Sequence, residues 1–298
     1  IEQSYKDPEY DQSQLETYVR NVLSLEGVAC KDWLTNKVDR SVTGKVARQQ
    51  CQGEIQLPLS DCGVVALDYT GKKGIATSIG HAPQAALVDS ANGSVLAVAE
   101  ALTNLAGAPL ADGVSLSANW MWPCKNPGED AALYRAVEAC SDFACALGIN
   151  IPTGKDSLSM TQKYGDDKVF APGTVIISAA AETSDVRKTL TPVLQRGESR
   201  LYYIDFSGDT LKLGGSAFAQ ALNALGSETP TVKDAAQFGR TFNAVQRMIN
   251  RGQIMAAHDV SAGGLVTTLL EMTFANTTGG IEMTTDRFTA DGETDLIK

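Results

Sequence analysis

The chain has 298 residues, of which 43% are hydrophobic and 20% are charged, so it can bury a large core in one or two domains. Its formal net charge of -10 repels polyanions, which excludes nonspecific binding to nucleic acid or to an anionic membrane but leaves room for a small anion bound with a metal. No stretch reaches the ~18 apolar residues of a membrane span, and no leader-like segment opens the chain, so we expect a cytoplasmic protein.

The cysteines give no metal or disulfide signature. Six are present, with no CxxC pair and no histidine cluster nearby: Cys30, Cys51, Cys62, Cys124, Cys140 and Cys145. We expect reduced, buried thiols, with disulfides or a metal as the less favoured alternative. The polar opening IEQSYKDPEYDQSQ and the closing DGETDLIK lead us to expect an excised part of a longer polypeptide.

The first half of the chain predicts strands alternating with helices. A helix is expected over about residues 12–25, ending at Gly27, followed by strands in SVTGKVA, DCGVVALDY and IATSIG. Small apolar residues over 85–105 predict a long buried helix around LAVAEALTNLAG. A second helix, EDAALYRAVEACSDFACALG, precedes INIPTGKDSLSM and the strand VFAPGTVIISAAAE.

A polar segment over residues 183–199 marks the expected domain boundary. Beyond it we expect the strand LYYIDFS, the helices LGGSAFAQALNALG and AAQFGRTFNAVQRMINRG, and the short strand IMAAHD leading through VSAGG into the helix LVTTLLEMTFANTT. Alternating strands and helices are typical of α/β layers.

Glu100 and Asn104 are the first candidates for chemistry. They lie four residues apart in a predicted helix, so both oxygen-bearing side chains share one face. Magnesium favours such ligands, whereas an ordinary helix-surface pair is the plainer explanation of the spacing. Their apolar surroundings favour the ligand role, because an uncompensated charge there is costly.

Asp61 enters an apolar strand in LPLSDCGVVAL and is either a metal ligand or a strand-start acid. The neighbouring Ser60 can donate to a phosphate or simply close the turn.

The segment MAAHDVSAGGLVTTLLEM is the most informative part of the sequence. A predicted strand delivers His258 and Asp259 to its carboxyl end, where α/β proteins tend to bind ligands. Ser261, Gly263 and Gly264 then open a helix whose free amides can hold an anion. Ser261 can equally be a simple N-cap, a role compatible with phosphate contact.

Three weaker signals remain open. Gly214 and Gly215 precede a helix, but they form neither a GxGxxG fingerprint nor a Walker loop. Lys155 and Asp156 lie in a predicted turn that is either functional or merely charged, and Lys31 is by chemistry alone a surface lysine.

Some enzyme classes are disfavoured. The two histidines leave little room for a Ser/His/Asp hydrolase or a histidine-rich zinc site. Since no cysteine context resembles a glutaminase nucleophile elbow, we do not expect glutamine hydrolysis in this chain.

Eight blocks in order resemble the family of large, single-chain phosphoribosylformylglycinamidine synthases. They are SVTGKVARQQ, LPLSDCGVVAL, VAEALTNLAGAP, LSANWM, PGEDAALY, IPTGKDSLSM, LGGSAFAQ and AAHDVSAGGL. The resemblance covers nearly all of the chain and points to the second half of the synthetase region.

The resemblance implies an α/β (α+β) fold of the aminoimidazole ribonucleotide synthetase type. Residues 1–30 would be a lead-in helix, residues 31–190 a barrel-forming sheet domain, and residues 191–298 an incomplete second α/β domain. Sites follow by residue: Asp61, Glu100, Asn104 and Asp259 as magnesium ligands, and Lys31, Ser60 and Ser261 as contacts to ATP or ADP. The role of Lys31 comes from the resemblance alone.

The resemblance further implies a carbon-nitrogen ligase that uses ATP and glutamine to convert formylglycinamide ribonucleotide to formylglycinamidine ribonucleotide in purine biosynthesis. This chain would supply an auxiliary magnesium-nucleotide site and half of a pseudo-dimer, with the first synthetase copy and a glutaminase domain as partners. We expect the isolated chain to be inactive.

Two other hypotheses are a stand-alone ATP-dependent synthetase or kinase of the same superfamily and a non-enzymatic interaction module that self-associates through a sheet edge.

Overall fold

The computed structural model describes residues 5–35, 38–260 and 262–283. None of the helices within those ranges combines the length and the apolar character needed to cross a bilayer. Of the six cysteines, Cys51, Cys62 and Cys140 are buried, but Cys30 and Cys145 are exposed, so the expectation of burial was wrong for these two.

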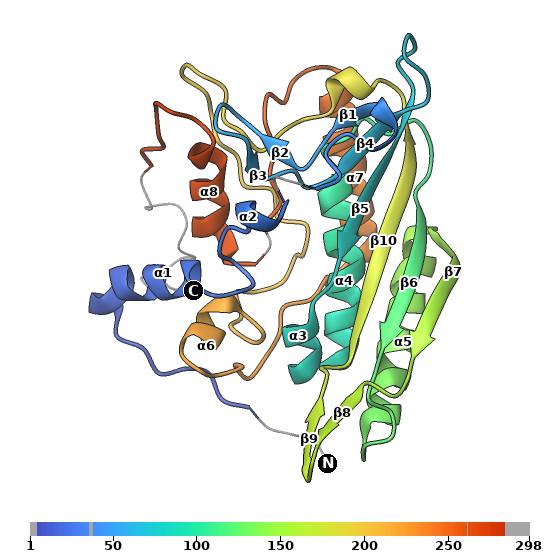
Figure 1. Ribbon diagram of the computed structural model, residues 1–298, viewed down its shortest axis with the longest axis vertical. Helices are drawn as coiled ribbons and strands as arrows, with labels where there is room; N and C mark the ends of the chain where they lie inside the picture. Colours follow the sequence, from blue (N-terminus) through green and yellow to red (C-terminus); the bar gives the residue numbers. More distant parts are fainter. Residues whose placement is uncertain (1–4, 36–37, 261, 284–298) are drawn as a thin grey trace.

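A six-stranded sheet forms the central layer, with strand order β1-β4-β5-β10-β6-β7 (Figure 1). Its strands are β1 (Val46–Arg48), β4 (Gly63–Ala66), β5 (Gly74–Gly80), β6 (Ser115–Met121), β7 (Asn150–Ser157) and β10 (Thr174–Thr183). Neighbouring strands are antiparallel except β6 and β7, which are parallel. The sheet is open, with β1 and β7 at its edges.

Two short hairpins lie outside this sheet. One pairs β2 (Cys51–Gln52) with β3 (Leu57–Pro58), and the other pairs β8 (Thr161–Tyr164) with β9 (Asp167–Phe170).

Helices cover one face of the sheet (Figure 1). They are α3 (Pro83–Val88), α4 (Ser90–Leu105), α5 (Glu129–Leu147) and α7 (Ala235–Asn250). The middle helix, α4, packs directly on β5 and β10, while α5 packs on α4 and α7 packs on α5. The main hydrophobic core lies between these layers, and Phe238 of α7 belongs to it.

The close approach of α4 to the sheet depends on small residues. Asp89 caps the helix by accepting from the amides of Ala91 and Asn92. A Cβ on Gly80 of β5 would lie 2.2 Å from the carbonyl oxygen of Ala97, so only glycine permits this contact. The sequence VLAVAEAL therefore places the polar Glu100 at a fixed position beside the end of β5.

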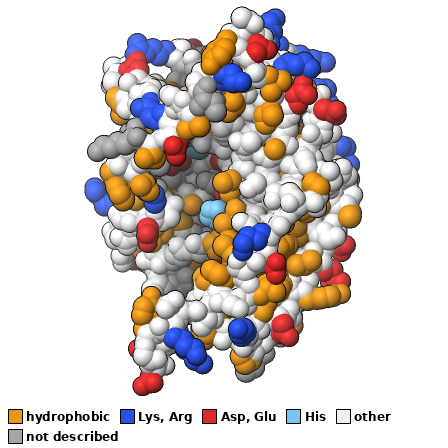
Figure 2. All heavy atoms as spheres, turned by 45° about the vertical axis from the view of Figure 1, so that its right-hand side comes forward, with side chains coloured by type: hydrophobic (Ala, Val, Ile, Leu, Met, Phe, Trp, Pro, Cys, Tyr) orange, Lys and Arg blue, Asp and Glu red, His pale blue; other side chains and the backbone are white. Residues whose placement is uncertain are grey.

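The opposite face of the sheet is largely exposed. Side chains of β5 alternate strictly between buried and exposed positions, as a half-covered strand requires. On the exposed side Val65, Ile75 and Ile79 are 41%, 44% and 56% accessible. Figure 2 shows hydrophobic side chains gathered beside a hollow on one face of the molecule.

The remaining helices are grouped away from the outer strands β6 and β7 (Figure 1). They are α1 (Leu15–Leu23), α2 (Asp32–Thr35), α6 (Ala217–Ala221) and α8 (Gly264–Phe274), with short 3-10 turns at Gln12–Gln14, Val42–Gly44 and Val186–Lys188. The first helix packs on α6, where Tyr18 and Phe218 lie edge to face with ring centroids 5.4 Å apart.

Most predicted helices are confirmed in type, namely those matching α1, α4, α5, α7 and α8. The single helix expected over residues 85–105 is divided, because the extended backbone of Asp89 separates α3 from α4. The helix predicted in LGGSAFAQALNALG is shorter, because Gly215 and Gly226 adopt positive φ on either side of the five residues of α6.

Two strand predictions were wrong. Neither LYYIDFS nor IMAAHD forms a strand, although both lie within the described residues. A strand requires a paired neighbour. In IMAAHD the backbone makes a contact of another kind, a hydrogen bond from the Ala257 amide to the carbonyl of Thr191.

The turn predicted in IPTGKDSLSM was also wrong. Residues 151–157 of this segment, including Lys155 and Asp156, belong to β7, where Lys155 lies opposite Asn119 of β6. Gly154 permits the pairing, because a Cβ there would meet the carbonyl oxygen of Ala118 at 2.2 Å.

Candidate functional site

Asp61 lies in the loop between β3 and β4, with its side chain 13% exposed. Ser60 braces this loop: its hydroxyl donates to the Gln49 carbonyl at 2.7 Å and accepts from Gln52 Nε2 at 2.8 Å. One Asp61 oxygen, Oδ1, is 2.7 Å from His258 Nδ1. Burial raises the pKa of Asp61, and the hydrogen bond with His258 only partly opposes that rise.

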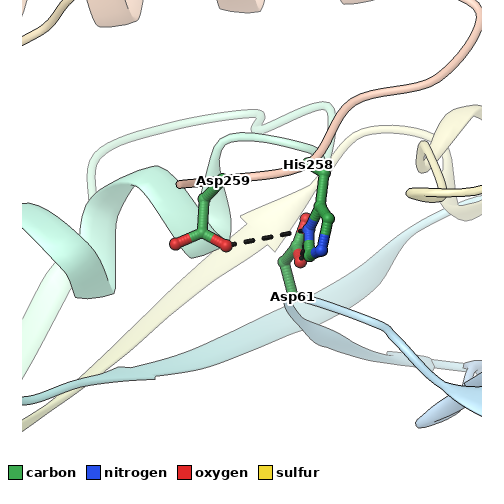
Figure 3. A group of neighbouring side chains, drawn as sticks. All are labelled: Asp61, His258 and Asp259. Atoms are coloured by element: carbon green, nitrogen blue, oxygen red, sulfur yellow. Dashed lines mark hydrogen bonds and ion pairs between the residues drawn. The ribbon is translucent and has the colours of Figure 1, made fainter. Parts of the chain in front are cut away.

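His258 lies on the segment between α7 and α8, beside Asp61 and Asp259 (Figure 3). Its side chain is 7% exposed, and its second nitrogen, Nε2, is 3.0 Å from Glu271 Oε2 of α8. Burial by itself lowers the pKa of His258, but hydrogen bonds with Asp61 and Glu271 outweigh it and raise the pKa to about 10. At neutral pH the ring is therefore a buried cation between two carboxylates.

Asp259 is the least compensated group in the site. Its Oδ1 is 3.8 Å from His258 Nδ1, and its side chain is 6% exposed. Its other oxygen, Oδ2, is buried without a hydrogen-bond partner in the described part of the chain. Burial and the nearby Asp61 carboxylate raise the pKa of Asp259 well above its ordinary value. Such a buried oxygen is unfavourable unless a cation or a donor meets it.

Glu100 and Asn104 of α4 each make a hydrogen bond to the backbone at the end of β5. Glu100 Oε2 accepts from the amide of His81 at 2.6 Å, and Asn104 Nδ2 donates to the Ile79 carbonyl at 2.9 Å. Burial raises the pKa of Glu100, against the opposing His81 amide. The Glu100 carboxylate also raises the pKa of Asp259, although burial and Asp61 contribute more.

The donor set fits a hard divalent cation. One ligand atom from each of Asp61, His258 and Asp259 lies within 4.8 Å of the others. Carboxylate and amide oxygens are what magnesium prefers. Because both His258 nitrogens face carboxylates, this ring is better placed to orient Asp61 than to bind the metal itself.

Lys31 and Ser261 are the other two residues predicted to contact nucleotide. The Lys31 ammonium donates to the backbone carbonyls of Glu26 and Ala29, and Ser261 lies outside the described residues. The helix predicted after the glycines is α8, and Thr268 in its second turn donates to the Asp259 carbonyl at 3.2 Å. The amino end of α8 therefore lies beside the carboxylates, where its free amides suit an anion.

Gly214 and Gly215 serve chain packing. The Gly214 amide donates to the Glu228 carbonyl at 2.7 Å, and a Cβ on Gly215 would meet the backbone of Ala85 in α3 at 2.6 Å.

Sequence reasoning missed Glu271 and gave His258 no role. A signal for Glu271 was present: it is the single charged residue of the otherwise uncharged helix α8. It also follows Thr268 by three residues, which places both on one helix face.

Comparison with known proteins identifies two matching families. Residues 30–182 match the FGAR-AT PurM_N-like domain, and residues 202–293 match the AIR synthase related protein, C-terminal domain. Human phosphoribosylformylglycinamidine synthase is 46% identical over 265 residues, which are 88% of this chain and 20% of that protein. The chain thus spans about a fifth of the length of this curated relative.

Solved structures share the fold at low identity. T. maritima PurL complexed with FGAR matches with a TM-score of 0.52 and 14% identity, covering 87% of this chain and 38% of that one. T. maritima PurL complexed with ADP matches with a TM-score of 0.52 and 15% identity, covering 87% and 36%. At these identities the likeness shows the fold alone.

Proposed function

The chain belongs to the phosphoribosylformylglycinamidine synthase family, and from this premise we propose that it is one part of an ATP- and glutamine-dependent ligase of purine biosynthesis. The whole protein would convert formylglycinamide ribonucleotide to formylglycinamidine ribonucleotide. This part would contribute a magnesium-nucleotide site and one half of a pseudo-dimer. We propose the cytoplasm as its location and residues 31–190 and 191–298 as its two domains.

One observation carries the proposed site: Asp61 and Asp259, 198 positions apart in the chain, come together beside His258, and an Asp259 oxygen there is buried without a hydrogen-bond partner in the described part of the chain. We assign Asp61, Glu100, Asn104 and Asp259 to hold Mg2+. We assign Lys31, Ser60 and Ser261 to the nucleotide.

A bound Mg2+ supplies charge neutralisation and fixed geometry for the phosphates of ATP or ADP. Hydrogen bonds within the chain position the proposed ligands. His258 holds Asp61 in place, Glu271 holds His258, and the His81 amide holds Glu100. The amino end of α8 lies close to Asp259, and its free backbone amides would suit a phosphate held there.

The expected result is magnesium-dependent ADP binding by the folded chain. Equilibrium dialysis with radiolabelled ADP should show saturable binding in MgCl2 that disappears in EDTA. Glu100→Gln should lower the affinity by about tenfold or more, because an amide replaces a charged ligand. Glu138→Gln, at an exposed position of α5, is the matched control and should bind as the parent does. A folded chain that binds no ADP would refute the site assignment.

The isolated chain should not turn over ATP, since the proposed site is auxiliary. Sustained ATP hydrolysis under the same conditions would instead favour a stand-alone synthetase or kinase of the superfamily.

The exposed sheet face favours a role in assembly. Val65, Ile75 and Ile79 expose apolar side chains on the side of the sheet that the helices leave open, with Thr77 between the two isoleucines. Because exposed apolar sheet faces tend to be covered, we propose that the first synthetase copy packs on it.

Sedimentation velocity tests this assembly. The chain mixed with the first synthetase half should form a complex, and Ile75→Lys should prevent it by placing a charge in the interface. Tyr134→Lys, at a 66% exposed position on α5, is the control and should leave the complex intact. A complex that survives Ile75→Lys would exclude this face as the interface.

A further inference from the structure

A second hollow, which we call the basic pocket, lies at the carboxyl end of α7, beside β1 and the 3-10 turn Val186–Lys188. Its volume is about 610 Å3, which is in the range of small-molecule sites. Its described lining includes Arg48, Arg187, Lys188 and Arg251, with no aspartate or glutamate. Among the residues that the structure describes, none of those assigned to magnesium or nucleotide lines it.

The concentration of positive charge is unusual for this chain, whose net charge is -10. Arg187 is neutralised by Asp185 at 2.8 Å. Arg48 and Lys188 are instead held by neutral carbonyls: Arg48 Nη2 donates to Thr189 at 2.7 Å, and Lys188 Nζ donates to Asn250 at 3.0 Å. These backbone bonds position the cations without cancelling their charge, so an anion entering the pocket would relieve their mutual repulsion.

Two buried donors in the pocket lack a partner. Thr189 is 4% exposed, and its hydroxyl Oγ1 makes no hydrogen bond in the described part of the chain. The Nε of Arg48 is also buried and makes no hydrogen bond in that part of the chain. Burial lowers the pKa of Arg48, as expected for a cation that has lost water without gaining an anion. Each unpartnered donor is unfavourable unless an acceptor meets it.

The remaining lining is partly apolar. Leu190, Ile249, Ile254 and Met255 form this part of the wall. An inorganic anion would leave such a wall unused, whereas a ligand with a flat apolar body beside its anionic group would cover it. The negative charge of the whole chain disfavours a polyanion such as nucleic acid.

We propose that the basic pocket binds a phosphate monoester of mononucleotide size. Its phosphate oxygens accept from Arg48, Thr189 and Arg251, while its ring system lies on Ile254 and Met255. This goes beyond the proposed magnesium-nucleotide site, because it needs no metal and uses other residues.

Isothermal titration calorimetry in EDTA tests the proposal, since EDTA abolishes the metal-dependent site. The probes are AMP, ribose 5-phosphate, inorganic phosphate and adenosine. AMP should bind most tightly, ribose 5-phosphate less so, and adenosine not at all. Arg251→Ala should lower the affinity for AMP by about tenfold, as expected for one charge-assisted hydrogen bond.

Three further variants sharpen the result. Arg240→Ala, at a 70% exposed position in α7, is the matched control and should leave AMP binding unchanged. Thr189→Val removes the unpartnered hydroxyl without emptying its space, so the chain should stay folded while AMP affinity falls. Asp61→Asn should retain AMP binding in EDTA, which separates this site from the magnesium site.

Absence of AMP binding, or equal losses in Arg251→Ala and Arg240→Ala, would overturn the proposal. Phosphate binding as tightly as AMP would reject the mononucleotide-sized ligand.

Discussion

Asp259→Asn is expected to lower the affinity for Mg2+ by about 100-fold, at the upper end of what disturbing a metal site costs. The same change should raise the thermal stability of the metal-free chain. The two effects have one cause: Asp259 is a buried carboxylate beside Asp61, and both burial and that neighbour raise its pKa. An asparagine removes the repulsion and with it the charge that attracts the metal.

Differential scanning fluorimetry with and without MgCl2 measures both effects. The parent chain should be stabilised by Mg2+, because a ligand that binds only the folded state raises the melting temperature. Asp259→Asn should melt higher than the parent in EDTA and gain almost nothing from Mg2+. Asp142→Asn, at an exposed position of α5, should behave as the parent does. If Asp259→Asn melted lower in EDTA, Asp259 would be a structural acid rather than a ligand awaiting a cation.

His258→Ala is expected to lower the free energy of unfolding of the metal-free chain by about 3 kcal/mol at pH 7, the scale found when one partner of a buried ion pair is removed. The imidazolium lies between Asp61 and Glu271, so its loss leaves two carboxylates and Asp259 without their cation. Denaturant unfolding in EDTA measures the loss. Added Mg2+ should recover part of it, because the metal replaces the missing positive charge.

The pH dependence of folding stability provides a second test of the role of His258. The pKa of His258 rises from 6.5 to about 10 on folding, so folding favours the protonated ring. Its contribution to stability is therefore complete below pH 6.5 and is lost as the pH rises toward about 10. The parent should lose stability over this window and His258→Ala should lose much less. His81→Ala, which changes the other, exposed histidine, should keep the parental slope. Equal slopes in the parent and in His258→Ala would contradict a buried imidazolium.

Local pattern predicted the helices well, because their side chains repeat over several turns. Most of the run LAVAEALTNLAG lies in α4, which Asp89 caps, and Gly263 and Gly264 lie at the start of α8 as expected. Strands were predicted less well, since a strand depends on what lies beside it. LYYIDFS has the composition of a strand but forms none, whereas the charged and glycine-containing IPTGKDS pairs with β6.

The candidate site was likewise only partly predictable from the sequence. The chemistry of Asp61, Glu100, Asn104 and Asp259 was apparent from their residue types and apolar surroundings, and their predicted roles as ligands remain to be tested. The relay from Glu271 through His258 to Asp61 joins positions 271, 258 and 61, and no spacing in the chain connects the last to the others.

Local sequence preferences indicate which segments form helices, where glycine allows a close approach, and which oxygen-bearing side chains lie in apolar surroundings. These follow from the preferences of neighbouring residues. Tertiary contacts alone establish which of those side chains meet, that an imidazolium lies among the carboxylates, and that arginines from β1, from the 3-10 turn Val186–Lys188 and from the residue after α7 share one hollow. Electrostatic energy depends on distance in space and on burial, and neither is contained in the order of residues along the chain.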